Sequence, residues 1–261
     1  MKSRIHKMDL LTYFASCQKN NMKFLKLFLK DMYVSSTDLN KKNIESLFDK
    51  NRKAHLLDLG CDDGVLTMRY AKIIGTKTIT GVDIIASRLK VAKSLGIKTV
   101  KANLNEVLPI KTSTIDVIHA NQVIEHIGDL DTFASEMYRV LKPGGYALVS
   151  TENGSSWVNI VAAIMGWQIF SSTNMSGKRL GIGNPFSIHG DEVLELSSWT
   201  HKTIFNIRGL REFLEVHGFE IVDMKGAGYF PLPAMIGNID KTHCHFMTFK
   251  VRKPLSDSTS K

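Results

Sequence analysis

One short segment combines acidic residues with glycines in a way that suits the binding of a polar ligand. The sequence LLDLGCDDG, residues 56–64, is an apolar run followed by Asp58, Gly60 and Gly64. Glycines at a strand-to-helix turn let the backbone approach a ligand, and the free N–H groups of the helix point toward it. The segment lacks both G-x-G-x-x-G, typical of dinucleotide-binding loops, and the Gly-Lys-Ser/Thr of P-loops. It therefore predicts a ligand-binding turn of another kind.

Two further polar positions follow at the ends of the next predicted strands. Asp83 ends the segment TITGVD, where a carboxylate can accept hydrogen bonds from both ribose hydroxyls of a nucleoside. Asn103 and Leu104 follow the segment IKTVKA, and an amide side chain can both accept from and donate to an adenine edge. The order of these residues predicts a nucleoside site.

Three histidines are candidates for a general base. His126 lies just beyond a fourth predicted strand, and His189 and His201 flank a long insertion. A neutral imidazole can remove a proton from an acceptor near neutral pH. For each of the three, a purely structural hydrogen bond is the competing interpretation. His243 and His245 alternate onto one strand face, but two histidines without a third ligand are weak evidence, and we expect no metal site.

The elements that must position these residues follow from hydrophobic patterning. From residue 55 onward, short apolar runs alternate with helical patterns, which predicts βαβ units and a parallel sheet. Right-handed crossovers place the carboxyl ends of the strands along one edge, where open α/β sheets bind ligands. We expect the site just after Leu59, Val82, Ala102 and Ala120.

Composition and turn signals divide the chain into three parts. Residues 1–53 are expected to form a basic helical extension, residues 54–253 the α/β domain, and residues 254–261 a disordered tail. Residues 154–200 interrupt the alternation with an apolar run at 157–170 and a Gly/Ser/Asn-rich stretch. A long insertion above a site edge is usually a lid or a substrate-binding element.

The net charge of +9 is concentrated at the front of the chain, because residues 1–54 carry +7 of it. This basic segment keeps open a contact with an anionic membrane or with RNA, and residues 157–170 are a second candidate for peripheral membrane contact. Three widely spaced cysteines predict neither a disulfide framework nor a zinc pair. The first residues lack the apolar core of a secretion signal, so we expect a cytoplasmic protein.

These motifs, in this order, resemble the class I S-adenosylmethionine-dependent methyltransferases, particularly the small-molecule branch. The resemblance rests on DLGCDDG (58–64), GVDI (81–84), ANLNEVLP (102–109), DVIHANQVIEHI (116–127) and LKPGGYALVSTEN (141–153). It implies an α/β fold with a Rossmann-like seven-stranded methyltransferase sheet and helices on both faces. It also implies S-adenosyl-L-methionine as cofactor and S-adenosyl-L-homocysteine as product.

The resemblance assigns roles to the matching positions. Gly60 and Gly64 would approach the methionine moiety of the cofactor, and Asp58 would help hold its ammonium group. Asn121 and Gln122, after the fourth strand, would border the cofactor and the acceptor. The full expected cofactor-binding set is Asp58, Gly60, Cys61, Asp62, Gly64, Asp83, Ile84, Asn103, Leu104, Asn121 and Gln122.

Two positions depart from the family pattern. Asp62 stands where the pattern has its middle glycine, which adds a carboxylate and a Cβ close to the ligand. Asn103 stands where an Asp is usual, although its carbonyl can still accept a hydrogen bond from the adenine amine.

Motifs that are absent from the sequence limit the classes of methyl acceptor that we expect. The fourth strand is followed by neither Asn/Asp-Pro-Pro-aromatic nor a Pro-Cys nucleophile, which disfavours a nucleobase. We expect methyl transfer to a small-molecule, glycan-precursor or lipid-like acceptor, with oxygen the favoured atom. The alternatives are an RNA methyltransferase, an RNA- or membrane-binding protein on a methyltransferase-like scaffold, and aminopropyl transfer. The oligomeric state is left open.

Overall fold

Seven strands form one sheet in the computed structural model, which describes residues 10–189 and 200–255, with side chains from residue 24 onward. The strands are β1 (His55–Leu59), β2 (Thr78–Asp83), β3 (Lys98–Lys101), β4 (Ile115–Asn121), β5 (Leu141–Glu152), β6 (Glu220–Ala227) and β7 (Phe246–Arg252). Their order is β3-β2-β1-β4-β5-β7-β6. The first five are parallel, and β7 is antiparallel to both of its neighbours. The predicted Rossmann-like sheet is therefore confirmed.

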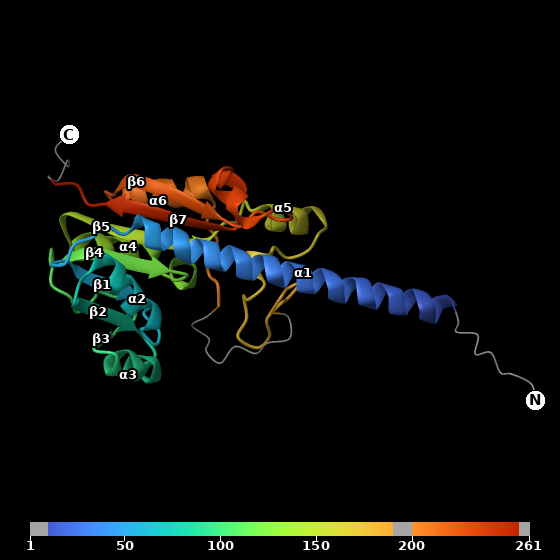
Figure 1. Cartoon of the computed structure of the whole chain (residues 1–261), viewed down its shortest axis with the longest axis horizontal. Coiled ribbons are helices and arrows are strands. Elements are labelled where there is room, and N and C mark those ends of the chain that lie inside the picture. Colours follow the sequence, from blue (N-terminus) through green and yellow to red (C-terminus); the bar gives the residue numbers. More distant parts are fainter. Residues whose placement is uncertain (1–9, 190–199, 256–261) are drawn as a thin grey trace, which may run out of the picture.

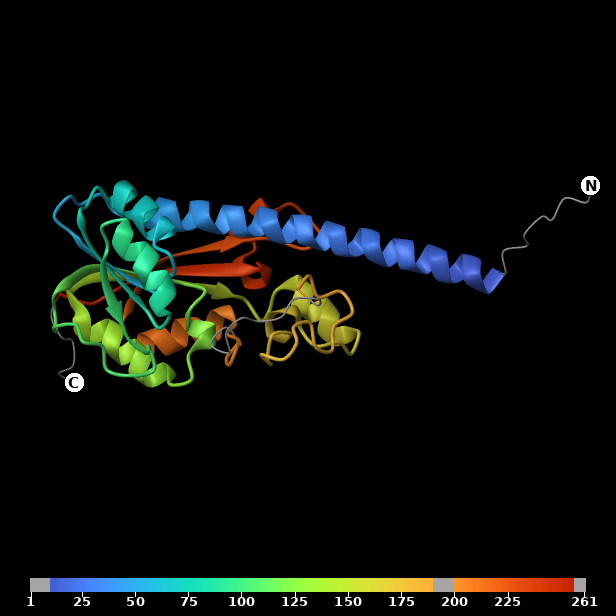
Figure 2. The same cartoon turned by 90° about the horizontal axis from the view of Figure 1, so that it is seen from below.

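Helices cover both faces of the sheet, as the alternation of elements predicts (Figures 1 and 2). They are α1 (Leu10–Leu47), α2 (Val65–Ile74), α3 (Ala86–Ser94), α4 (Leu130–Val140), α5 (Trp157–Ile164) and α6 (Ile207–Val216). One hydrophobic cluster joins the sheet to α1, α2 and α3, and the other joins it to α4 and α6. The strands β1 and β4 are almost wholly buried because both of their faces are covered.

Helix α1 is more than an appended extension. Its C-terminal end contributes Ile44 and Leu47 to the core, beside α2. Asn40 donates a hydrogen bond to Ser150 of β5 and accepts one from Thr248 of β7, and all three residues are buried. The other half of the helix projects beyond the body of the molecule (Figure 1). The C-terminal part of the expected extension is thus part of the domain core.

The insertion between β5 and α6 lies beside α1, at the carboxyl end of β5 (Figure 2). Its described part contains α5 and the 3-10 turn η2 (Phe170–Ser172). Asn159 of α5 donates to Ser171 and accepts from its backbone N–H, which ties the helix to the turn. Residues 1–9, 190–199 and 256–261, on which part of the expected extension, insertion and disordered tail falls, lie outside the described residues.

Among the residues that the structure describes, none of the helices is long and apolar enough to cross a membrane.

Candidate active site

The turn between β1 and α2 contains two glycines at which an added side chain would clash with neighbouring residues. Gly60 and Gly64 have φ angles of 71° and 81°, in the left-handed region that glycine adopts freely. A Cβ at Gly60 would lie 2.6 Å from a methyl group of Val123, and one at Gly64 would lie 2.5 Å from Ile97. The backbone N–H groups of Gly60 and Cys61 donate to the carbonyl of Val82, which fastens the turn to the end of β2.

This packing makes a testable prediction about the turn. Replacing Gly64 with alanine should lower the free energy of unfolding by about 1–3 kcal/mol more than replacing Gly96 does, because the added methyl group overpacks a full site. Gly96 is a matched control, since its φ is 89° and a Cβ added there would meet no atom of a non-neighbouring residue within 4 Å. Urea unfolding of the two variants measures the difference, and equal losses would contradict the predicted close packing.

Asp62, the residue at the family's middle glycine position, fits the turn without a glycine. Its φ is 48°, a conformation that Asp tolerates better than most residues. Its carboxylate lies 3.2 Å from Nε of Arg88 on α3 and is largely exposed. Burial raises the pKa of Asp62, Arg88 opposes the rise, and the charges of Asp63 and Asp83 add to it. The extra carboxylate is therefore directed toward α3, where it has a counter-ion.

Asp83 is held ready to accept further hydrogen bonds at the end of β2. Its Oδ2 accepts from the backbone N–H of Asp62 at 3.0 Å, and its Oδ1 accepts from Ile85 at 2.9 Å. Because a carboxylate has about four acceptor positions, both oxygens can still accept from two ribose hydroxyls. Ile84, which follows it, is 46% exposed and presents an apolar surface next to this carboxylate.

Asp58, a residue of β1, is buried beneath the glycine turn and faces β4. Its Oδ1 is 2.7 Å from Nδ1 of His119, its Oδ2 accepts from the hydroxyl of Thr67, and the residue is 3% exposed. His119 packs against the ring of Tyr70, with centroids 4.6 Å apart. The contact of Asp58 with the cofactor ammonium stays a prediction. Nothing in the sequence marked His119 as the partner of Asp58.

The remaining predicted cofactor residues lie along the same edge of the sheet. Asn103 accepts from Asn105 and donates to Glu106, so its amide also orders the loop after β3. Leu104 packs against the core cluster under α4 and α6. Cys61 is buried, and desolvation raises the pKa of its thiol to about 12, so the thiol stays protonated at neutral pH.

The two residues that end β4 are oriented by neighbouring elements. Asn121 accepts a hydrogen bond from Asn40 of α1 at 3.3 Å. Gln122 has a φ of 55°, and its backbone N–H donates to Ser150 of β5 at 2.8 Å. The buried Nε2 of Gln122 has no hydrogen-bond partner among the described residues, so this amide is available to a ligand.

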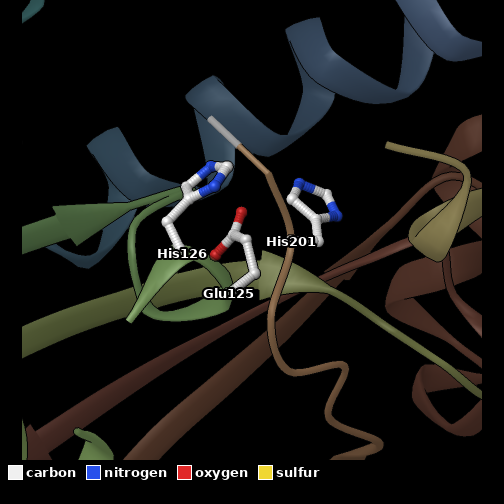
Figure 3. Close-up of side chains that lie close together, drawn as sticks. All are labelled: Glu125, His126 and His201. Carbon is white, nitrogen blue, oxygen red and sulfur yellow. The ribbon is translucent and has the colours of Figure 1, made fainter. Parts of the chain in front are cut away.

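Two of the three predicted histidines come together beyond β4, beside a carboxylate (Figure 3). Glu125 and His126 lie on the 3-10 turn η1 (Ile124–His126), and His201 lies on the extended segment after the insertion. The backbone N–H of Lys202 donates to the carbonyl of Glu125 at 2.7 Å and holds this segment against the turn. The two imidazole rings are 4.8 Å apart, and one ligand atom from each of the three side chains lies within 4.8 Å of the others.

Backbone carbonyls fix how these histidines can act. Nδ1 of His126 donates to the carbonyl of Thr200 at 3.2 Å, and Nδ1 of His201 donates to that of Ser171 at 2.6 Å. In the neutral rings this leaves the Nε2 lone pairs to accept a proton or bind a cation. Carbonyl acceptors behind histidine rings are the usual arrangement where histidines ligate a metal.

Burial shifts the pKa values of two members of the cluster, Glu125 and His126, toward their uncharged forms. Desolvation lowers the pKa of His126 to about 4, and the neighbouring His201 contributes to the decrease. Desolvation also raises the pKa of Glu125 to about 8. Oε2 of Glu125 accepts from Thr151, whereas its buried Oε1 has no partner among the described residues. A buried carboxyl oxygen without a partner, beside two imidazole rings, is a donor set that fits a divalent cation.

His189 does not join this cluster, because its ring lies against Tyr33 of α1 with centroids 5.8 Å apart. Glu125 was not among the predicted site residues. Its signal in the sequence is the Glu-His pair that follows the fourth strand, Glu125 and His126.

The residues at this edge fit S-adenosylmethionine. The glycine turn follows β1, Asp83 ends β2 and the free amide of Gln122 follows β4, and these three strands are adjacent in the sheet. The strand order reverses between β1 and β4, which is where open α/β sheets bind nucleotide ligands. Along the sheet edge, the ribose would meet Asp83 at β2, the methionine moiety the glycine turn after β1, and the acceptor Gln122 after β4.

Comparisons with known proteins agree with this geometry. A family model described as a methyltransferase domain matches residues 33–224. The chain therefore belongs to the family of class I S-adenosylmethionine-dependent methyltransferases. The match begins within α1, consistent with the packing of that helix into the core.

Individual relatives are more distant. The mitochondrial ubiquinone biosynthesis O-methyltransferase of Rattus norvegicus is 29% identical over 123 residues, which are 44% of this chain and 35% of that protein. The chain spans about a third to a half of the length of the first curated relatives that it matches.

Solved structures show the same fold at lower identity. An S-adenosylmethionine-dependent methyltransferase from Mesorhizobium loti has a TM-score of 0.56 at 15% identity, and the match covers 81% of this chain and 96% of that one. The [4+2]-cyclase SpnF has a TM-score of 0.54 at 19% identity, and the match covers 84% of this chain and 82% of that one. Since a cyclase shares the fold, the reaction has to be argued from the site.

Proposed function

We propose that this protein transfers a methyl group from S-adenosylmethionine to a hydroxyl oxygen of a small organic acceptor. The observation that carries the proposal is the cluster of Glu125, His126 and His201 beyond β4. It lies next to the expected donor edge and presents proton-accepting and cation-binding groups. The name of the curated relative, an O-methyltransferase, supports oxygen as the accepting atom.

The reaction asks two things of the protein. S-adenosylmethionine supplies an activated methyl group whose leaving group is a neutral thioether. The protein must hold the acceptor oxygen in line with that methyl group, and it must lower the cost of removing the hydroxyl proton. The Nε2 lone pairs of His126 and His201 suit the second task, because their Nδ1 hydrogens are bound to carbonyls.

We further propose that the same three side chains hold a divalent cation, against the expectation from the sequence that there is no metal site. Two histidines and one carboxylate bind zinc in catalytic sites and leave a position open for another ligand. An acceptor oxygen in that position would lose its proton more readily, because a cation lowers the pKa of a bound hydroxyl. The three ligand atoms lie within 4.8 Å of one another, and zinc binds such ligands at about 2.0–2.2 Å.

Metal removal tests this part of the proposal. After treatment with EDTA and its removal by gel filtration, methyl transfer to simple phenols and catechols should fall at least about tenfold. Adding Zn²⁺, Mn²⁺ or Mg²⁺ should restore it, whereas donor binding measured by calorimetry should stay unchanged. If the metal-free protein keeps its full rate, the histidines act without a cation.

A peripheral membrane contact is a second proposal, carried by the projecting half of α1. Phe24 and Leu27 are 72% and 54% exposed, and Lys26 and Lys30 lie between and after them. Exposed apolar side chains interleaved with lysines suit an anionic lipid surface. Sedimentation with lipid vesicles tests this proposal. The protein should sediment with anionic vesicles more than with neutral ones, whereas a helix that binds RNA should associate with neither.

A further inference from the structure

We propose that a cavity between α1, α5 and the segment joining β6 to β7 binds the apolar arm of the acceptor, so that the acceptor is an uncharged amphipathic molecule. This inference rests on the proposed function, and it names the substrate class of the same site. The space between these elements is about 460 Å³, counting the part that is open to solvent.

The wall of the cavity is mostly apolar. Its apolar lining comes from α1, α5, the turn η2 and the segment between β6 and β7. These residues are Leu29, Met32, Tyr33, Val158, Phe170 and Phe230. None of the described lining residues is Lys, Arg, Asp or Glu. A phosphorylated or otherwise anionic ligand would be buried here without a counter-charge, which is costly. The cavity therefore favours an uncharged, lipid-like arm over a nucleotide or a glycan phosphate.

Two polar atoms on this wall lack partners within the described part of the chain. They are Oγ of Ser156 and Nε2 of His245, and both atoms are buried. Ser156 occupies the N-cap position of α5, where a serine hydroxyl usually accepts from the first turn, yet it makes no cap hydrogen bond. Buried polar atoms are nearly always paired, so these two point to a ligand with a hydrogen-bonding group.

The other polar side chains around the cavity show what pairing looks like here. The hydroxyl of Ser36 donates to the carbonyl of Met32, and that of Tyr229 donates to Asp240. His243 is 2.8 Å from Asp240 as well. Ser36, Tyr229 and His243 thus have protein partners, whereas Oγ of Ser156 and Nε2 of His245 have none among the described residues.

Two segments of the chain connect the cavity with the Glu125–His126–His201 cluster. At the end of β5, Thr151 donates to Glu125, and the backbone N–H of Asn153, just after the strand, donates to the carbonyl of the cavity residue His245. The turn η2 joins the two sites a second time. Phe170 lines the cavity, and the carbonyl of Ser171 accepts from His201. Because the cavity residue Phe170 is followed directly by Ser171, the partner of His201, an acceptor with its arm in the cavity would extend its polar end toward the cluster.

The test uses 4-alkylphenols of increasing chain length as probes, with binding measured by calorimetry in the presence of S-adenosylhomocysteine. Affinity should rise about fourfold per methylene until the cavity is full, the value expected for burial of one CH₂. Val158→Trp fills the cavity and should abolish this dependence. Val161→Trp is the matched control, since Val161 lies on the same helix, is 42% exposed and is not among the lining residues.

Ser156→Ala separates a binding role from a structural one without a large change in volume. Because its hydroxyl has no partner among the described residues, the variant should unfold at the same or a higher urea concentration than the wild type, while it binds the alkylphenols at least about threefold more weakly. A chain-length-independent affinity, or equal binding by Val158→Trp and the wild type, would overturn the inference. If donor binding and phenol methylation persist in that case, the proposed function stands and only the cavity assignment fails.

Discussion

Replacing His201 with alanine should reduce methyl transfer to a hydroxyl acceptor by about 10²–10⁴-fold, the range typical for loss of a proton-accepting group. The variant removes one of the two imidazoles whose Nδ1 hydrogens are bound to carbonyls and whose Nε2 atoms are available. Donor affinity should remain within about twofold, because His201 is not among the residues expected to bind the cofactor. Release of S-adenosylhomocysteine measures the rate, and calorimetry measures the affinity.

The neighbouring Lys202→Ala variant is the control for this experiment. Its side chain is exposed, and its contact to Glu125 is made by the backbone and survives the substitution. It should keep most of its activity. A His201→Ala variant as active as Lys202→Ala would show that the cluster takes no part in the reaction. Glu125→Gln then distinguishes a cation-assisted reaction from proton removal by histidine alone. If Glu125 is a cation ligand, the variant should bind metal about 10–100-fold more weakly. If a histidine acts without a cation, the variant should keep its rate of methyl transfer.

Replacing Asp83 with alanine should weaken binding of S-adenosylmethionine by about 100-fold or more. Hydrogen bonds to a charged group contribute about 1.5–3 kcal/mol each, and this carboxylate is positioned to accept two from the ribose. The substitution also releases the backbone N–H groups of Asp62 and Ile85, which the carboxylate now holds. Asp83→Asn keeps one acceptor oxygen and should have an intermediate affinity.

Asp63→Ala serves as the control for Asp83, because it removes the same charge from the same edge of the sheet. Its carboxylate accepts from the backbone N–H of Val65, at the start of α2. It should lose far less donor affinity. Equal losses in the two variants would mean that the turn responds to net charge and not to a specific ribose contact.

The fold was predictable because each of its elements has a local signal. Apolar runs such as HLLDLG and TITGVD are bounded by turn residues, and the segments between them have helical patterns, so the parallel sheet follows. The glycine turn and Asp83 were predictable for the same reason, since the turn directly follows one strand and Asp83 ends the next. Their positions along the edge depend only on strand order.

Features that depend on long-range contacts were not predictable. The pairing of Asp58 with His119 joins two strands, and nothing local marks that histidine as a partner. The meeting of His126 with His201 depends on where the insertion returns to the sheet. The burial of Asn40 likewise follows from α1 crossing β5 and β7, which the basic, amphipathic pattern of the first residues conceals.

Titration of the intact protein with S-adenosylmethionine and S-adenosylhomocysteine in a calorimeter measures whether the edge formed by β1, β2 and β4 binds the cofactor. We expect saturable binding of one cofactor molecule per chain, strongly reduced in Asp83→Ala and preserved in His201→Ala. Folded protein that gives no binding heat with either compound, at several temperatures, would contradict this expectation.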